Sequence, residues 1–205
     1  MKNTKTSNKP IAKPTTKIIA GEFKGKTLEL PSLDTTRSSK ARLKESVFNV
    51  LQFDIIDKIF IEAFAGSGSI GLEAISRGAK RAYFIELDKD SYKILVNNCK
   101  KTDMNRCQTI QGNTFVQTPL ILDFLKNSND EVILYVDPPF DFRDGMEDVY
   151  IKSFRMIESI TANNIYKVII EHLSTIEIPE VLGQFCLEKT KKFGKSSISY
   201  YSYKK

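Results

Sequence analysis

Lys58-Ile59-Phe60-Ile61-Glu62-Ala63 is a mostly apolar run, and Phe64-Ala65-Gly66-Ser67-Gly68 follows it directly. A short apolar run that ends at a glycine-rich turn is typical of a buried strand. Residues 69–77 then show the apolar spacing of a helix. Strand, tight turn and helix in this order predict the start of a βαβ unit, in which right-handed crossovers build a mostly parallel sheet.

The same alternation continues along the chain. Further strands are predicted at residues 81–86, 107–111, 132–136 and 167–171, and helices at 89–101, 115–126 and 147–160. The last two strand-like runs, 185–192 and 196–203, have no helix between them, which predicts an antiparallel hairpin at one edge of the sheet. The predicted fold class is therefore α/β.

An N-terminal unit precedes this sheet. Residues 17–30 contain two short apolar runs around glycines and end at Pro31, which predicts a β-hairpin. Residues 38–53 have the spacing of an amphipathic helix with a basic start. Five lysines and no acid precede Ile18. We therefore expect a basic disordered tail at 1–17, the hairpin and basic helix at 18–53, and the main domain at 54–205.

The composition narrows the class of protein. A net charge of +6 and a pI near 9.1 favour attraction to a polyanion without identifying one. The three cysteines lack metal-ligand spacing, which argues against a disulfide framework or a zinc site. Without a long apolar stretch or a secretion-type start, membrane insertion and secretion are not expected, and a reducing cytoplasm fits best.

The glycine turn is a candidate cofactor site, because ligands of open α/β sheets collect at the carboxyl ends of the strands. Gly66 and Gly68 allow close backbone approach, although a plain tight turn is an equal alternative for this pattern alone. Glu86 ends the second strand and can accept hydrogen bonds from ribose hydroxyls, which suits NAD as well as S-adenosylmethionine. Asn113 follows the third strand, where it either contacts an adenine edge or serves the turn.

The second candidate site is Asp137-Pro138-Pro139-Phe140, directly after the predicted strand 132–136. An amino group on a nucleic-acid base is a poor nucleophile, and hydrogen bonds to Asp137 and to the Pro138 carbonyl would orient it. The prolines fix the backbone, and Phe140 can stack on an extruded base. The alternative is a proline-terminated strand whose aspartate caps the turn; the position after the fourth strand of a cofactor-type sheet favours the reactive site. For His172 we expect a structural role.

Several segments together resemble the bacterial 16S rRNA guanine-N2 methyltransferases of the RsmD type. The resemblance runs from about Ile18 to near the C-terminus and rests on residues 18–26, 42–51, 62–74, 84–86 and 136–140. It implies a class I Rossmann-like fold with a seven-stranded sheet, and S-adenosylmethionine as the donor. It also implies methylation of the N2 of one guanine, of the guanine-966 type. This chain departs from the family pattern with Arg37-Ser38-Ser39 in place of Arg-Pro-Thr, and with Glu62 in place of an aspartate.

The resemblance also assigns the site residues. The cofactor site would comprise Glu62, Phe64, Gly66, Ser67, Gly68, Glu86, Leu87 and Asn113, and the acceptor site Asp137, Pro138, Pro139 and Phe140. Basic side chains expected to meet RNA phosphates near the site, rather than only to face solvent, are Lys24, Lys26, Arg37, Arg42 and Lys44.

The expected partner is 16S rRNA or the small ribosomal subunit, and the expected state is a monomer. Three other functions stay open at this point. They are methylation of DNA amino groups, a non-catalytic RNA-binding module, and an NAD-dependent dehydrogenase on the same type of sheet.

Overall fold

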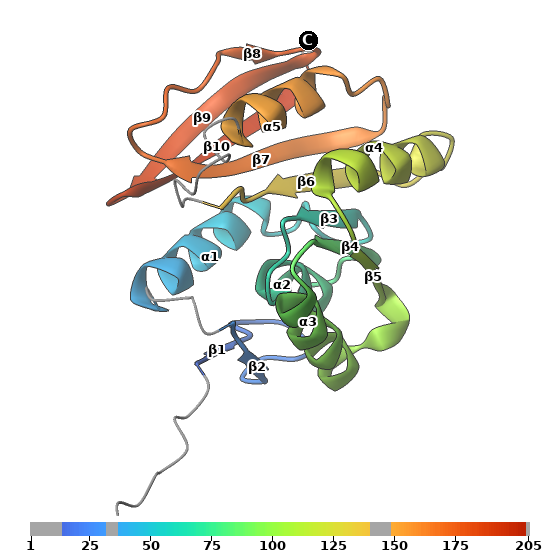
Figure 1. The fold of residues 1–205 in the computed structure, drawn as a ribbon, viewed down its shortest axis with the longest axis vertical. Coiled ribbons are helices and arrows are strands. Elements are labelled where there is room, and N and C mark those ends of the chain that lie inside the picture. The colour runs from blue at the N-terminus through green and yellow to red at the C-terminus, as the bar shows by residue number, and fades with distance from the viewer. Residues whose placement is uncertain (1–13, 32–36, 140–148, 204–205) are drawn as a thin grey trace, which may run out of the picture.

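The structure is a computed structural model that describes residues 14–31, 37–139 and 149–203, with the backbone alone for 37–40. The strands of the main sheet are β3 (Ile59–Ala63), β4 (Arg81–Glu86), β5 (Cys107–Gln111), β6 (Val132–Val136), β7 (Ile165–Leu173), β8 (Val181–Leu182), β9 (Phe185–Phe193) and β10 (Ser196–Tyr203). The helices are α1 (Arg37–Leu51), α2 (Ser69–Ser76), α3 (Lys89–Thr102), α4 (Thr114–Leu125) and α5 (Val149–Glu158), with a 3-10 turn at Met104–Arg106. Figure 1 shows their arrangement.

The sheet has the strand order β5-β4-β3-β6-β7-β10-β9-β8. Neighbouring strands from β5 to β7 are parallel, and β10, β9 and β8 pair antiparallel. This confirms the Rossmann-like α/β class with an antiparallel edge. The sheet has eight strands rather than the expected seven, because the two-residue strand β8 pairs with Phe185 and Cys186 of β9. A strand of two residues is too short to produce a periodic sequence pattern.

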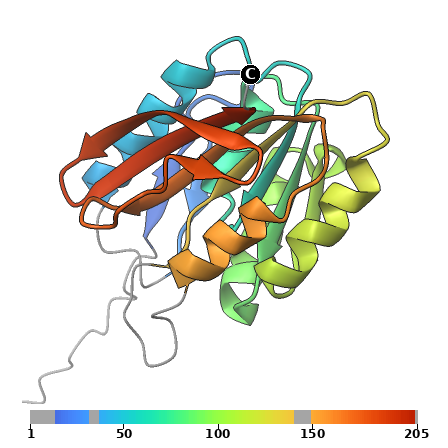
Figure 2. The same cartoon turned by 90° about the horizontal axis from the view of Figure 1, so that it is seen from above.

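Helices cover both faces of the sheet, as Figure 2 shows for α1 on one side and for α4 and α5 on the other. Phe60, Phe84 and Tyr135 point to the face covered by α1, α2 and α3. Their strand neighbours point to the face covered by α4 and α5. Every residue of β3 and β6 is buried, which explains why both strands read as continuous apolar runs.

The N-terminal hairpin consists of β1 (Thr15–Lys17) and β2 (Thr27–Glu29), which pair antiparallel. Strand β1 begins inside the stretch 1–17 that we expected to be a disordered tail, so that boundary was wrong. Thr15, Thr16 and Lys17 pair with β2, and the Leu30 N–H donates to the Pro14 carbonyl. A boundary drawn from charge alone misses this backbone pairing.

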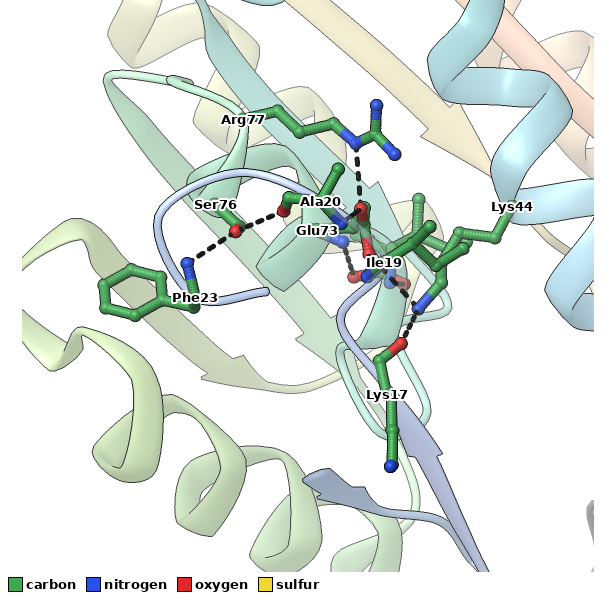
Figure 3. A network of polar contacts seen from close by, with 11 residues as sticks. Lys17, Ile19, Ala20, Phe23, Lys44, Glu73, Ser76 and Arg77 are labelled. Atoms are coloured by element: carbon green, nitrogen blue, oxygen red, sulfur yellow. Dashed lines mark hydrogen bonds and ion pairs between the residues drawn. The ribbon is translucent and has the colours of Figure 1, made fainter. Parts of the chain in front are cut away.

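The hairpin is fixed to α2 by Glu73, whose side chain is fully buried. Figure 3 shows its carboxylate accepting hydrogen bonds from the backbone N–H groups of Ile19 at 2.7 Å and Ala20 at 3.0 Å. The same carboxylate lies 2.8 Å from the Arg77 Nε and 3.4 Å from the Lys44 Nζ. One buried acid therefore holds the N-terminal hairpin, α1 and α2 together.

Candidate functional site

The two candidate motifs leave the sheet side by side. Ala63, the last residue of β3, is paired with Val136, the last residue of β6, and the Asp137 N–H lies 3.4 Å from the Ala63 carbonyl oxygen. The chain order reverses here, since β4 and β5 lie on one side of β3 and β6 and β7 on the other. This switch point is the usual ligand position in an open α/β sheet. The glycine turn and Asp137 thus share one edge of the molecule.

The glycine turn has the backbone of a close-approach loop. Gly66 and Gly68 have φ values of 54° and 76°, and the non-glycine Phe64 has a φ of 65°, a conformation that costs strain. A Cβ on Gly66 would meet nothing within 4 Å, so open space borders the backbone there. A Cβ on Gly68 would instead come within 2.4 Å of the Leu95 side chain. The first glycine therefore faces open space and the second faces the core.

Ser67 and Phe64 hold the turn in place. The Ser67 side chain is buried, and its carbonyl accepts a hydrogen bond from the Asn98 Nδ2 at 2.9 Å. Asn98 also bonds to the backbone of Glu29, so a fully buried amide joins the turn to the N-terminal hairpin. The Phe64 ring packs edge-on against Phe115, with the centroids 5.6 Å apart. No sequence pattern had singled out Asn98, because its partners lie far away along the chain.

Glu86 lies at the end of β4 with its carboxylate beside the turn. One oxygen accepts from the Gly66 N–H and the other from the Asp88 N–H, both at 2.7 Å. A carboxylate has about four acceptor positions, so both oxygens retain capacity for ribose hydroxyls. Leu87, the next residue, is 65% exposed, which leaves its apolar side chain available to cover a ligand.

We expect Glu86→Ala to weaken binding of S-adenosylmethionine about 10- to 100-fold, because hydrogen bonds to a charged group contribute roughly 1.5–3 kcal/mol. Isothermal titration calorimetry measures the change. The matched control is Glu180→Gln. Glu180 is exposed and directly precedes β8, the edge strand farthest from β5, so this change should leave the affinity unchanged. Equal affinities of wild type and Glu86→Ala would contradict this role.

Glu62 turns inward rather than toward the mouth of the site. Its buried carboxylate accepts from the backbone N–H groups of Gly71 at 2.8 Å and Ile70 at 3.3 Å, at the start of α2. These two N–H groups are therefore used by the protein itself. Burial raises the pKa of Glu62 to about 8, against the opposing effect of these donors.

The raised pKa of Glu62 predicts a pH-dependent stability. Its ordinary pKa is 4.5, so between that value and about 8 the folded protein keeps a proton that the unfolded chain releases. The contribution of Glu62 to the free energy of unfolding is therefore fully present below pH 4.5. It decreases as the pH rises from 4.5 to about 8. We expect the difference in Tm, wild type minus Glu62→Gln, to fall between pH 5 and pH 8. A difference that stays constant or grows would exclude this protonation state.

Asn113 caps α4, with its side-chain oxygen accepting from the Phe115 N–H at 2.9 Å. The neighbouring Gly112 N–H donates to the Glu86 carbonyl, so the ends of β4 and β5 are tied together. Asn113 also borders a cavity of about 550 Å³ between α4 and α5, which Phe115, Pro119, Lys152, Arg155, Met156 and Ser159 complete. Neither Gly66 nor Asp137 lines this cavity, so it does not include the two candidate motifs.

Asp137 is half-buried, Pro138 is buried and Pro139 is exposed, whereas Phe140 lies outside the described residues. The structure adds Tyr150 of α5 to this site. Burial raises the pKa of the Tyr150 phenol to about 12, and the negative charge of Asp137 acts in the same direction. The Tyr150 oxygen accepts a hydrogen bond from the Leu173 N–H at 3.2 Å, which ties the start of α5 to the end of β7.

A buried hydrogen bond supports the sheet beneath Asp137. The Tyr135 hydroxyl donates to the Glu171 carboxylate at 2.8 Å, across β6 and β7. Burial raises the pKa of Tyr135 well above its ordinary value, and the charges of Glu171 and Asp137 add to this. His172 is buried, with its two ring nitrogens near the Leu173 carbonyl and the Ser199 hydroxyl, and its structural role stays a prediction.

The five basic residues expected at RNA do not form one group. Lys24 and Arg42 are exposed, whereas the Lys26 ammonium donates to the Lys101 carbonyl. Of Arg37 only the backbone is described. Lys44 corrects the expectation, because it is 3% exposed and its ammonium donates to the Lys17 carbonyl at 2.8 Å beside Glu73. A lysine that is enclosed in this way cannot reach a phosphate.

Within the described residues, no group of three or more His, Cys, Asp or Glu side chains has the arrangement of a metal site. No helix in the same part of the chain has both the length and the apolar character needed to cross a membrane.

Comparison with known proteins places these features in a family. A model of the family described as conserved hypothetical protein 95 matches residues 16–202. The ribosomal RNA small subunit methyltransferase D of Haemophilus influenzae is 37% identical over 136 residues, which cover 65% of this chain and 68% of that protein. Its Escherichia coli counterpart is 33% identical over 125 residues, 60% of each chain. The aligned part thus spans less than two thirds of the Escherichia coli protein.

Solved structures show the same fold over nearly the whole chain. The structure named "Putative methyltransferase yhhF from Escherichia coli" has a TM-score of 0.70 and 26% identity, and the match covers 93% of this chain and 99% of that one. An RNA methyltransferase from Salinibacter ruber, solved in complex with S-adenosyl-L-homocysteine, has a TM-score of 0.53 and 15% identity. That match covers 79% of this chain and 90% of the other, and it shows the fold alone.

Proposed function

This chain belongs to the family described as conserved hypothetical protein 95, the RsmD family of methyltransferases, and we propose that it methylates the N2 amino group of a guanine in 16S rRNA. The proposed donor is S-adenosylmethionine, and the proposed target is of the guanine-966 type. The relatives named as small-subunit rRNA methyltransferases support the substrate. An rRNA target would place the protein in the cytoplasm, with 16S rRNA or the small ribosomal subunit as its partner.

The residues at the switch point fit the proposed donor. Gly66 borders open space at positive φ, and the Glu86 carboxylate beside it retains acceptor capacity for two ribose hydroxyls. Leu87 supplies an exposed apolar side chain next to Glu86. When bound, S-adenosylmethionine supplies an electrophilic methyl group. Glu62 and Asn98 hold the backbone of the turn and of α2 in position rather than facing this space.

Asp137 and Pro138 are proposed to bind the acceptor amine. A carboxylate and a backbone carbonyl accept the two N–H bonds of the amine, which turns its nitrogen lone pair toward the donor side. The buried Pro138 fixes the backbone that carries this carbonyl. After transfer the methylated nitrogen loses a proton readily, and Asp137 or water can take it. The main catalytic role proposed for Asp137 and Pro138 is therefore to orient the acceptor amine.

One observation carries the proposal: Ala63 and Val136 are register partners, so the turn and Asp137 begin from adjacent strand ends. A cofactor site and an amine-binding site that served different reactions would not need to be adjacent. The adjacency supports a donor site and an amine-binding site at one edge of the sheet, as group transfer requires.

The test is methyl transfer from isotopically labelled S-adenosylmethionine to small ribosomal subunits and to protein-free 16S rRNA. The account expects label in the RNA and N2-methylguanosine after digestion to nucleosides. Label in adenine or cytosine, or in DNA offered in parallel, would overturn the guanine assignment. Cofactor binding without transfer to any RNA would overturn the proposed function as a whole.

A further inference from the structure

The hairpin formed by β9 and β10 carries four lysines within seven residues: Lys189, Lys191, Lys192 and Lys195. Three of them are exposed, and Lys191 is half-buried. Within the described residues none of the four forms an ion pair. The nearby acid, Glu188, lies instead 2.8 Å from Lys167. We call these four residues the lysine hairpin.

The lysine hairpin is a dense group of lysines without an ion pair, whereas other exposed cations of the described residues that also have none, such as Lys24, Lys89 and Lys100, are scattered. Elsewhere in the described chain the pairs are Lys58–Glu131, Lys80–Asp130, Lys93–Asp90, Lys101–Glu29, Lys126–Asp123, and Arg106 with Glu22 and Asp103. Each of these cations is at least partly neutralised by its partner. Four positive charges within seven residues therefore add up to a local positive potential that an anionic partner meets, although the charge of Glu188 acts on Lys189.

The turn of this hairpin lies at the same edge of the sheet as Asp137. Strand β7 is parallel to β6 with Ile170 opposite Val136, and it continues to Leu173, about 10 Å further. Ser196 of β10 is paired with Leu173, and the Ser174 N–H donates to the Lys195 carbonyl at 2.8 Å. Since β9 lies three strands from β6, the lateral separation is about 15 Å.

Part of the lysine hairpin also shares a face with α1. Lys191 and Lys189 are opposite Ile198 and Tyr200 of β10, which belong to the core beneath α1. The Lys189 ammonium lies 5.3 Å from the centre of the Tyr200 ring. Figure 1 shows the end of the red hairpin on the same side of the molecule as the blue helix α1, which carries the exposed Arg42.

We propose that the lysine hairpin binds the phosphate backbone of the RNA substrate beside the target base. The proposal rests on the proposed function. Lysine ammonium groups bind phosphates as point charges and read no base, so this surface adds affinity without adding sequence preference. The backbone pairing of β9 and β10 holds these charges in place at the side of Asp137. The bound RNA would then extend from the switch point across the ends of β7, β10 and β9.

The test compares two variants with the same loss of charge. The first is Lys189→Gln/Lys191→Gln/Lys192→Gln/Lys195→Gln. The matched control is Lys80→Gln/Lys93→Gln/Lys100→Gln/Lys126→Gln, which changes exposed lysines on other parts of the surface. Filter binding of a 16S rRNA transcript is measured over a range of salt concentrations. The plot of log affinity against log salt should become shallower by about 0.7 per lost single-strand phosphate contact in the first variant alone.

Kinetics give a second readout. With saturating RNA the kcat of the hairpin variant should equal that of wild type, while its KM for RNA rises at least about tenfold. The double variant Lys192→Gln/Lys195→Gln should show about half the change in salt slope. A hairpin variant with the salt slope of wild type overturns the proposal, as does an equal loss in the control. Failure of wild type to methylate RNA would refute the proposed function instead, and the binding comparison would still decide about the hairpin.

Discussion

Replacing Asp137 by alanine is expected to reduce the rate of methyl transfer by at least about 100-fold, because the acceptor amine would lose the carboxylate that orients it. The reduction should appear in kcat, since the glycine turn and Glu86 remain intact for the cofactor. Asp137→Asn keeps an acceptor oxygen but loses the negative charge, so its rate should lie between those of wild type and Asp137→Ala. Single-turnover transfer to 16S rRNA with all components saturating measures these rates.

The control for this prediction is Asp123→Ala, which removes an exposed carboxylate that pairs with Lys126 on α4. It should retain the wild-type rate. Calorimetry should show that Asp137→Ala binds S-adenosylmethionine as tightly as wild type. If Asp137→Ala transferred methyl groups within about threefold of the wild-type rate, less than 1 kcal/mol in barrier height, the amine-binding role of Asp137 would be wrong.

Replacing Glu73 by alanine is expected to destabilise the fold by about 3–5 kcal/mol, the usual cost of breaking a buried ion pair on one side. The change removes the acceptor for the Ile19 and Ala20 N–H groups and leaves the buried Lys44 ammonium without its counter-ion. Burial already lowers the pKa of Lys44, and the Glu73 charge opposes that effect. Urea unfolding gives the free-energy difference from the midpoint and the m-value.

Lys44→Met is the matched control for Glu73. It removes the partner cation but leaves the carboxylate bonded to Arg77 and to both backbone N–H groups. We therefore expect a smaller loss of stability than for Glu73→Ala. The opposite ranking, or a Glu73→Ala protein as stable as wild type, would show that the N-terminal hairpin is not held by this acid.

Local patterns predicted the limits of several strands. The ranges of β4, β5, β6 and β10 agree with the predicted ranges residue for residue. For β4 and β6 the reason is physical: these mostly buried parallel strands are short, apolar and bounded by turn residues, so their limits are visible in the sequence. The adjacency of Ala63 and Val136 also follows from general topology, because the fourth strand of such a sheet returns beside the first.

Lys44 shows where a reading by charge fails. It was grouped with Arg42 as a basic side chain of one helix, yet it lies four residues before Phe48 and seven before Leu51, both fully buried. That spacing places Lys44 on the apolar face of α1. The burial of Lys44 could thus be read from the helical period. The buried ammonium is compensated by Glu73, a buried acid on another helix.

Other residues at the site could not be predicted from any local sequence pattern. Tyr150 contacts Leu173 from a helix, and Asn98 joins Ser67 and Glu29, which precede it by 31 and 69 residues. Such contacts depend on which elements become neighbours in space. They become visible only once the strand order is known.

The proposal that adjacent strand ends hold both donor and acceptor is tested most directly by a crystal structure with S-adenosylhomocysteine bound. The account predicts the ligand along the Gly66 turn, with the ribose hydroxyls on the Glu86 carboxylate and the sulfur facing Asp137. A ligand bound in the cavity between α4 and α5, with its sulfur directed away from Asp137, would contradict it.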